Sequence, residues 1–341
     1  MIKAKSGDTL VKNRHQNLGL SDEVVLSMYE SMLKARRVDE RLWLLNRAGK
    51  IPFVVSCQGQ EAAQVGAAFG LNREKDYVAP YYRDFGFVFA WGMTVKEMML
   101  NNFAKAEDPS SAGRQMPGHF SYRKLRMLSH SSPVTTQNPH AVGIALAAKI
   151  KGDDLVSFVD FGEGSSNQGD FHEAANFAAV HKLPVIFMCE NNQYAISVGL
   201  KHQLACAHVS DRAVGYGMFG KSFDGNDPLA AYAAVKEAAD RAHRGEGPTL
   251  LEANCYRLMP HTSDDNDMTY RTKQEVDEAK KHDGVLTFAA YLRSVGVLTE
   301  EREKQMEDQV RKEIDEATDY AENAPFADPD SVLRYVYEEK N

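Results

Sequence analysis

Apolar residues along this chain follow two different spacings, and their order predicts an α/β fold. Short apolar runs at residues 155–161 and 184–189 are typical of buried strands. Between them, residues 167–181 carry apolar side chains at helical spacing. A strand, a helix and a strand in this order predict two parallel strands joined by a crossover helix.

Similar patterns predict further elements on both sides of this unit. Helices are predicted at residues 22–46, 139–150 and 228–244, and a last, solvated helix has apolar residues spaced from Met306 to Ala321. Strands are predicted near residues 222–224 and 249–254, whereas residues 72–92 mix strand and loop character.

No segment resembles an interdomain linker, so we expect one domain. The predicted organisation is an N-terminal extension over residues 1–20 and a single α/β domain over residues 21–341. This domain is expected to have a mostly parallel central sheet, helices on both faces of the sheet and outer C-terminal helices.

Polar residues gather where the two central strands end. Gly162-Glu163-Gly164 follows the first strand, and Glu190-Asn191-Asn192 ends the second. Because the carboxyl ends of parallel strands share one edge of a sheet, Glu163 and Asn192 are expected to face one another across a crevice. Their oxygens suit Mg²⁺, and the glycines and the helix that starts after Ser165 suit a phosphate. The sequence therefore predicts a site for a metal-bound diphosphate.

A dinucleotide site is the weaker alternative for the same glycines. The pattern Gly162-x-Gly164-x-x-Asn167 lacks the third glycine of the Rossmann fingerprint, which allows close packing of helix and strand. An NAD-binding oxidoreductase is thus the remote reading.

Composition excludes several classes of partner. The net charge of −8 argues against nucleic acid or an anionic membrane, and no apolar run is long enough to span a bilayer. The four cysteines show no CxxC spacing, so a zinc site is not expected. The first residues lack the apolar core of a signal peptide, so we expect a cytoplasmic protein.

The strings GEGSSNQGDFHEAANFAA and FMCENNQYAIS resemble the alpha subunit of the thiamine diphosphate-dependent 2-oxoacid dehydrogenase decarboxylases. The resemblance runs from about Arg14 to the C-terminus. It implies the thiamine diphosphate-binding fold, with Mg²⁺ held by Glu163, Asn192 and the backbone carbonyl of Tyr194. Many members have Asp where this chain has Glu163, and branched-chain members use Glu.

The resemblance also implies the remaining cofactor contacts. Tyr82 and Arg83 match diphosphate-binding positions, and backbone groups of Ser132 and Val134 match positions that bind the aminopyrimidine ring. The implied cofactor set is completed by Gly162, Gly164, Ser165, Ile196 and His261. Without the resemblance, Arg83 would be interpreted as a surface arginine in a salt bridge.

His261 is the implied catalytic residue of this chain. It lies in residues 256–275, which match a mobile loop that orders over the cofactor; taken alone, this segment is an acidic surface loop and His261 a structural histidine. A structural potassium site is implied at Ser131, Thr136 and Gln137. His119 lies in the family-like string GRQMPGHFS, but the sequence assigns it no role.

The activity implied by the resemblance is the oxidative decarboxylation of 2-oxo acids, with transfer of the acyl group to the lipoyl group of an acyltransferase component. A beta subunit is expected to complete an α₂β₂ heterotetramer. The strings IPFVVSCQGQEAAQVGAA and RLMPHTSDDNDMTYR are most like bacterial branched-chain members, so branched-chain 2-oxo acids are the expected substrates. A pyruvate dehydrogenase alpha subunit is the alternative, and a non-catalytic assembly subunit would show a degraded metal site.

Overall fold

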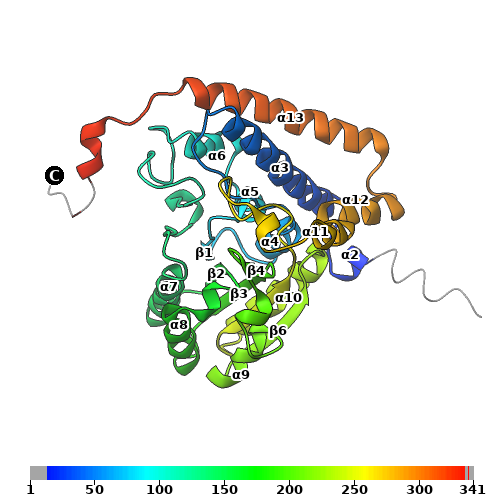
Figure 1. The fold of residues 1–341 in the computed structure, drawn as a ribbon. Coiled ribbons are helices and arrows are strands. Elements are labelled where there is room, and N and C mark those ends of the chain that lie inside the picture. Colours follow the sequence, from blue (N-terminus) through cyan, green and yellow to red (C-terminus); the bar gives the residue numbers. More distant parts are fainter. Residues whose placement is uncertain (1–13, 335–336, 338–341) are drawn as a thin grey trace, which may run out of the picture.

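A five-stranded parallel sheet forms the centre of the structure, a computed structural model that describes residues 14–334 and 337 (Figure 1). Along the sheet the strands are β1 (Tyr77–Ala79), β2 (Ser157–Gly162), β3 (Val185–Asn191), β7 (Thr249–Asn254) and β6 (Phe219–Asp224). Every neighbouring pair in this sheet is parallel, so all five carboxyl ends lie at one edge. The predicted α/β class with a mostly parallel sheet is confirmed.

Two hydrophobic cores cover the two faces of the sheet, because side chains of a strand alternate between its faces. Phe158 of β2 and Ile186 of β3 lie in the larger core, whereas Val159 and Phe187 lie in the smaller one. The larger core is closed by α4 (Glu61–Phe69), α5 (Phe85–Trp91) and α10 (Pro228–His243), and the smaller one by α7 (Gln137–Lys151) and α8 (Gly169–Val180). The continuous apolar strands are explained by this two-sided burial.

Outside these layers, the long helices α3 (Asp22–Arg47) and α13 (Glu300–Asn323) run side by side (Figure 1). Ion pairs such as Arg37–Glu307 link them, and α13 buries only a narrow stripe that includes Val310 and Ile314. The predicted solvated outer helix is confirmed. The other helices are α2 (Arg14–Asn17), α6 (Val95–Asn102), α9 (Ala213–Tyr216), α11 (Lys273–Ala279) and α12 (Gly284–Ser294). In the described part of the chain, no helix is long and apolar enough to cross a membrane.

The first thirteen residues of the predicted N-terminal extension lie outside the described residues. The rest of it includes α2, whose His15 is buried and hydrogen-bonded through Nδ1 to the Tyr291 hydroxyl at 2.7 Å.

Two local predictions were wrong. Residues 85–91, expected as strand or loop, form helix α5, which is buried on every side and therefore shows no helical periodicity. The segment after Ser165 is a single 3₁₀ turn, Ser165–Asn167, and α8 begins only at Gly169. The extended backbone of Gln168, with ψ of 147°, separates the turn from the helix.

Close packing of α4 on α10 predicts a large cost for enlarging Gly66. A Cβ there would lie 2.3 Å from the Pro228 carbonyl oxygen and 2.5 Å from the Ala231 Cβ. We expect Gly66→Ala to destabilise the chain by about 3 kcal/mol in urea unfolding, because both obstacles belong to a rigid helix. Gly143→Ala in α7 is the matched control, since nothing lies within 4 Å of its Cβ position. The control is expected to be neutral or stabilising by up to about 1 kcal/mol, and an equal loss in both variants would contradict the packing argument.

Candidate functional site

The register of β2 and β3 brings the two predicted strand-end residues together. Gly162 pairs with Glu190, so Glu163, one residue after this pair, and Asn192, two residues after it, leave the sheet at the same edge. The backbone N–H of Asn192 donates to Oε2 of Glu163 at 3.3 Å. The predicted crevice at the carboxyl edge of the sheet is thereby confirmed.

A cavity of about 440 Å³ opens above this edge. All the cofactor-binding positions named from the sequence line it: Tyr82, Arg83, Ser132, Val134, Gly162, Glu163, Gly164, Ser165, Asn192, Tyr194, Ile196 and His261. The sequence analysis missed its apolar wall, which consists mainly of Phe53, Val55, Met116 and Pro117. These residues lie in segments without helix or strand, where the sequence has no periodic pattern that would predict a shared surface.

The three residues expected to hold a metal, Glu163, Asn192 and Tyr194, all line the cavity. Glu163 is 1% exposed, and its carboxylate makes no ion pair within residues 14–334. Asn192 donates through Nδ2 to Gln60 at 2.8 Å, which fixes its amide so that Oδ1 is the remaining acceptor. The Tyr194 carbonyl oxygen accepts from Arg257 Nη1 at 3.0 Å. Burial raises the pKa of Glu163 because it disfavours the charged carboxylate. A bound cation would stabilise the charged form and so lower the pKa again.

The loop after β3 has a strained backbone. Gln193 and Ile196 both have positive φ, 77° and 56°, and the second value is unusual for a β-branched residue. Arg257 holds this loop by donating to the carbonyl oxygens of Tyr194 and Ile196. Gly164 packs so closely below it that an added Cβ would lie 2.5 Å from the Ala195 Cβ. Tyr194, Ala195 and Ile196 of this loop line the cavity.

Arg83 is a buried cation without an acidic partner. It is 1% exposed, and Nη1 donates to the Ser56 carbonyl oxygen at 2.6 Å. No carboxylate within residues 14–334 forms an ion pair with it. The alternative of a surface arginine in a salt bridge is therefore wrong. A buried charge normally has a counter-charge, so Arg83 calls for an anionic ligand in the cavity.

His261 is a neutral hydrogen-bond donor in this site. Arg83 Nη2 lies 3.1 Å from His261 Nδ1; the guanidinium can only donate, so Nδ1 accepts and the proton is on Nε2. Burial, followed by repulsion from Arg83 and Arg257, lowers the pKa of His261 to about 3. His261 therefore offers an N–H at Nε2 over the whole neutral pH range.

The segment that carries His261 is tied to the protein rather than being a free surface loop. Asp265 accepts from the His261 backbone N–H at 2.7 Å and is hydrogen-bonded to the Tyr270 hydroxyl, which also accepts from Arg257. The Glu275 carboxylate accepts from the hydroxyls of Tyr194 and Tyr256 at 2.7 and 2.8 Å. The segment is thus anchored to the same strained loop that supplies the Tyr194 carbonyl.

Of the three residues named for potassium, the structure brings two into contact. The hydroxyls of Ser131 and Thr136 are hydrogen-bonded to each other, and the Pro133 carbonyl oxygen lies within hydrogen-bonding distance of both, at 3.0 and 3.2 Å. Gln137 donates to the backbone of Asp160 at 3.1 Å, and its Oε1 is buried without a partner.

Comparisons with known proteins agree with this geometry. A family model described as "Dehydrogenase E1 component" matches residues 29–330. The chain belongs to this family. It is 65% identical over 325 residues to the 2-oxoisovalerate dehydrogenase subunit alpha of Bacillus subtilis, covering 95% of this chain and 98% of that protein.

Two further relatives are less similar to this chain. The 3-methyl-2-oxobutanoate dehydrogenase subunit alpha of Mycobacterium tuberculosis is 37% identical, with 97% of this chain and 87% of that protein covered. The pyruvate dehydrogenase E1 component subunit alpha of Staphylococcus aureus is 36% identical, with 94% and 84% covered.

Beneath the cavity of this E1 chain lies a carboxyl cluster that the sequence analysis missed. One oxygen from each of Asp84, Asp160 and Glu190 lies within 4.8 Å of the other two, and all three residues are fully buried. Burial raises the pKa of each, that of Glu190 to about 8. No lysine, arginine or histidine within residues 14–334 forms an ion pair with them, so burial keeps Glu190 protonated at neutral pH. The sequence signal that could have revealed this cluster is Asp160, a carboxyl residue within an otherwise apolar strand.

Hydrogen bonds connect this cluster to the site. Gln64 donates to Glu190 Oε2 at 3.1 Å, and the Tyr81 hydroxyl lies between that oxygen and Gln60 Oε1 at 3.5 and 3.3 Å. Gln60 is the residue that orients Asn192. The protonation of the cluster and the position of Asn192 are therefore linked by one buried network.

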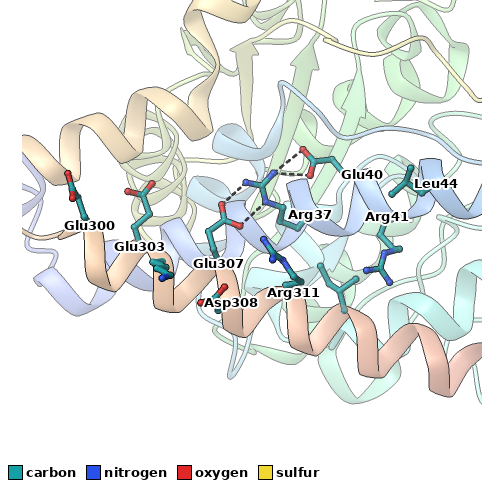
Figure 2. A pocket seen from close by; sticks show the side chains of 11 residues that line it. Arg37, Glu40, Arg41, Leu44, Glu300, Glu303, Glu307, Asp308 and Arg311 are labelled. Carbon is teal, nitrogen blue, oxygen red and sulfur yellow. Dashed lines mark hydrogen bonds and ion pairs between the residues drawn. The ribbon is translucent and has the colours of Figure 1, made fainter.

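A larger groove of about 920 Å³ lies between α3 and α13 (Figure 2). Its central arginine, Arg37, is bonded to both Glu40 and Glu307. Because Arg37 is paired with these carboxylates, its charge is already balanced. This groove therefore gives no reason to expect a charged ligand, unlike the cavity.

Because of the carboxyl cluster, we expect the free energy of unfolding to fall as the pH rises. A carboxyl whose pKa is higher in the folded than in the unfolded chain stabilises the fold at low pH, and this contribution is lost as the pH approaches the folded value, about 8 for Glu190. We expect Glu190→Gln to gain about 1 kcal/mol per pH unit relative to the parent chain between pH 6 and pH 8. Urea unfolding at several pH values measures this. Glu278→Gln, at an exposed position, is the control, and parallel pH curves for E190Q and the parent would refute the assignment.

Proposed function

We propose that this chain is the alpha subunit of a branched-chain 2-oxoacid dehydrogenase decarboxylase. The complete enzyme would carry out thiamine diphosphate-dependent oxidative decarboxylation of branched-chain 2-oxo acids and pass the acyl group to the lipoyl group of an acyltransferase component. The relative at 65% identity is named for 2-oxoisovalerate, whereas the pyruvate-named relative is 36% identical. Residues 21–341 would act as one domain, within an α₂β₂ heterotetramer in the cytoplasm.

One observation carries this proposal: a buried carboxylate and a buried guanidinium, neither of which has an ion-pair partner within residues 14–334, line the same cavity. Glu163 and Arg83 are each 1% exposed. A magnesium diphosphate supplies both missing charges, the metal to Glu163 and the phosphate oxygens to Arg83.

The residues of the cavity fit this cofactor. Mg²⁺ would be held by Glu163 together with Asn192 Oδ1 and the Tyr194 carbonyl oxygen, once Arg257 yields that carbonyl. Tyr82 would contact the diphosphate beside Arg83. Ser132 and Val134 would hold the aminopyrimidine ring, with Gly162, Gly164, Ser165 and Ile196 completing the wall. A potassium ion at Ser131, Thr136 and Gln137 is supported by the unpartnered Oε1 of Gln137.

Thiamine diphosphate, when bound, supplies a carbanion nucleophile and an electron sink. This chain's part is to position and to polarise. The Nε2–H of His261 would donate to an oxygen that gains negative charge, and Arg83 keeps that ring in place. Phe53, Val55, Met116 and Pro117 form an apolar wall that suits a branched side chain and excludes water.

The test of this function uses the chain co-expressed with its beta subunit. With thiamine diphosphate and Mg²⁺ in a dye-linked decarboxylation assay, we expect a higher kcat/KM for 4-methyl-2-oxopentanoate than for pyruvate. Glu163→Ala is expected to lower kcat/KM by about 100-fold or more, because a metal ligand is lost. Glu278→Ala is the surface control. Preference for pyruvate would overturn the substrate, and no turnover of either acid would overturn the decarboxylase itself.

The neutral state of His261 gives a separate prediction. His261→Ala is expected to lower kcat by about 100-fold, as for the loss of one preorganised donor. Since the pKa of His261 is about 3, its ionisation lies below the assay range, and the variant's residual activity should follow the pH profile of the parent enzyme between pH 6 and 9. Loss of a pH-profile limb in the variant would mean that His261 titrates as a base instead.

A further inference from the structure

The cavity contains a serine–histidine pair that the proposed machinery does not use. His119 Nε2 lies 2.7 Å from the Ser132 hydroxyl oxygen, and both residues line the cavity. His119 is 6% exposed. Its neighbour Gly118 has φ of 83°, and an added Cβ there would lie 2.7 Å from the Tyr82 carbonyl oxygen, so this backbone lies directly against the cofactor wall.

The surroundings of His119 fix which ring nitrogen carries the proton. Nδ1 lies 2.9 Å from the Met116 carbonyl oxygen, which can only accept a hydrogen bond. Nδ1 therefore donates, and in the neutral ring Nε2 is left as the acceptor for the Ser132 hydroxyl.

The group packed against His119 is a second histidine. The His130 ring lies 5.1 Å from the His119 ring, and neither of its nitrogens has a partner. Burial lowers the pKa of His130 to about 3. On its other side the Tyr82 ring lies 5.7 Å away. His119 is thus held by the His130 ring, by the carbonyl oxygens of Met116 and Pro117, and by Ser132.

With its proton engaged by His119, the Ser132 hydroxyl presents lone pairs to the cavity. Within residues 14–334 this hydroxyl has no second hydrogen-bond partner. Such an acceptor recognises an N–H donor. A 2-oxo acid and a diphosphate offer only acceptors at neutral pH, and a thiazolium ring has no N–H. The exocyclic amino group of the aminopyrimidine is the N–H donor of the proposed ligands.

We propose that His119 is a positioning residue that holds the Ser132 hydroxyl as an acceptor for the amino group of the aminopyrimidine ring. This inference rests on the proposed function. It assigns a role to two side chains, whereas the contacts expected from the sequence at Ser132 involve its backbone. Ser132 would touch the cofactor, and His119 would act through Ser132.

The experiment compares the affinities of the co-expressed complex for thiamine diphosphate and for oxythiamine diphosphate, which has oxygen in place of the amino group. Binding is measured by titration calorimetry with Mg²⁺ and without substrate. The parent complex is expected to prefer the amino compound. Ser132→Ala and His119→Ala should each reduce this preference by about tenfold, and the double variant should lose no more than either single one. His119→Gln, which keeps an acceptor oxygen on a side chain of similar reach, should retain most of the preference. His202→Ala, at an exposed position, is the control.

The outcomes distinguish a failure of this inference from a failure of the proposed function. If His119→Ala weakens binding of both compounds equally and leaves the preference intact, His119 is merely structural and the inference fails. Additive losses in the double variant would also refute it, because the two residues would then act separately. If the parent complex binds neither compound, the proposed function fails instead.

Discussion

The parallel pairing of β2 with β3 fixes the geometry on which the site depends. Because the two strands run in the same direction, the residues that follow them lie at the same edge of the sheet. Gly162 opposite Glu190 sets this register, and Glu163 and Asn192 follow from it. The side chains inside the sheet alternate into two apolar cores, so a shift of one residue would exchange the cores and separate the site. The register that packs the sheet therefore also places the polar groups of the site.

Buried charges distinguish the site from the scaffold. Arg36 is buried as well, but it is bonded to Glu61 at 2.6 Å and to Asp283 at 2.7 Å, so its charge is balanced within the fold. Arg83 and Glu163 have no such partners within residues 14–334. Since an unbalanced buried charge costs several kcal/mol, the apo chain carries a penalty that a charged ligand removes. The unpaired charges are thus the clearest physical sign of what the cavity accepts.

A second group of buried polar contacts determines how the site groups are oriented. Arg257 holds the strained loop through two carbonyl oxygens, Gln60 turns the Asn192 amide, and Arg83 fixes the tautomer of His261. Each of these contacts joins residues that are far apart in sequence or lie in irregular segments. The orientation of each ligating atom is therefore a property of the assembled loops, and of the protonated carboxyl cluster that supports them.

The sequence alone determined the alternation of strands and helices around residues 155–191, the polar strand ends and the residues that the family resemblance names. This was possible because strand burial and strand-end chemistry are local in sequence. It did not determine helix α5, whose complete burial removes any periodicity, nor the 3₁₀ turn before α8. Only the tertiary structure revealed the burial of Arg83, the tautomers of His261 and His119, and the meeting of Asp84 with Asp160 and Glu190. Protonation and unpaired charge depend on distances between separate segments, and those distances exist only once the chain is folded.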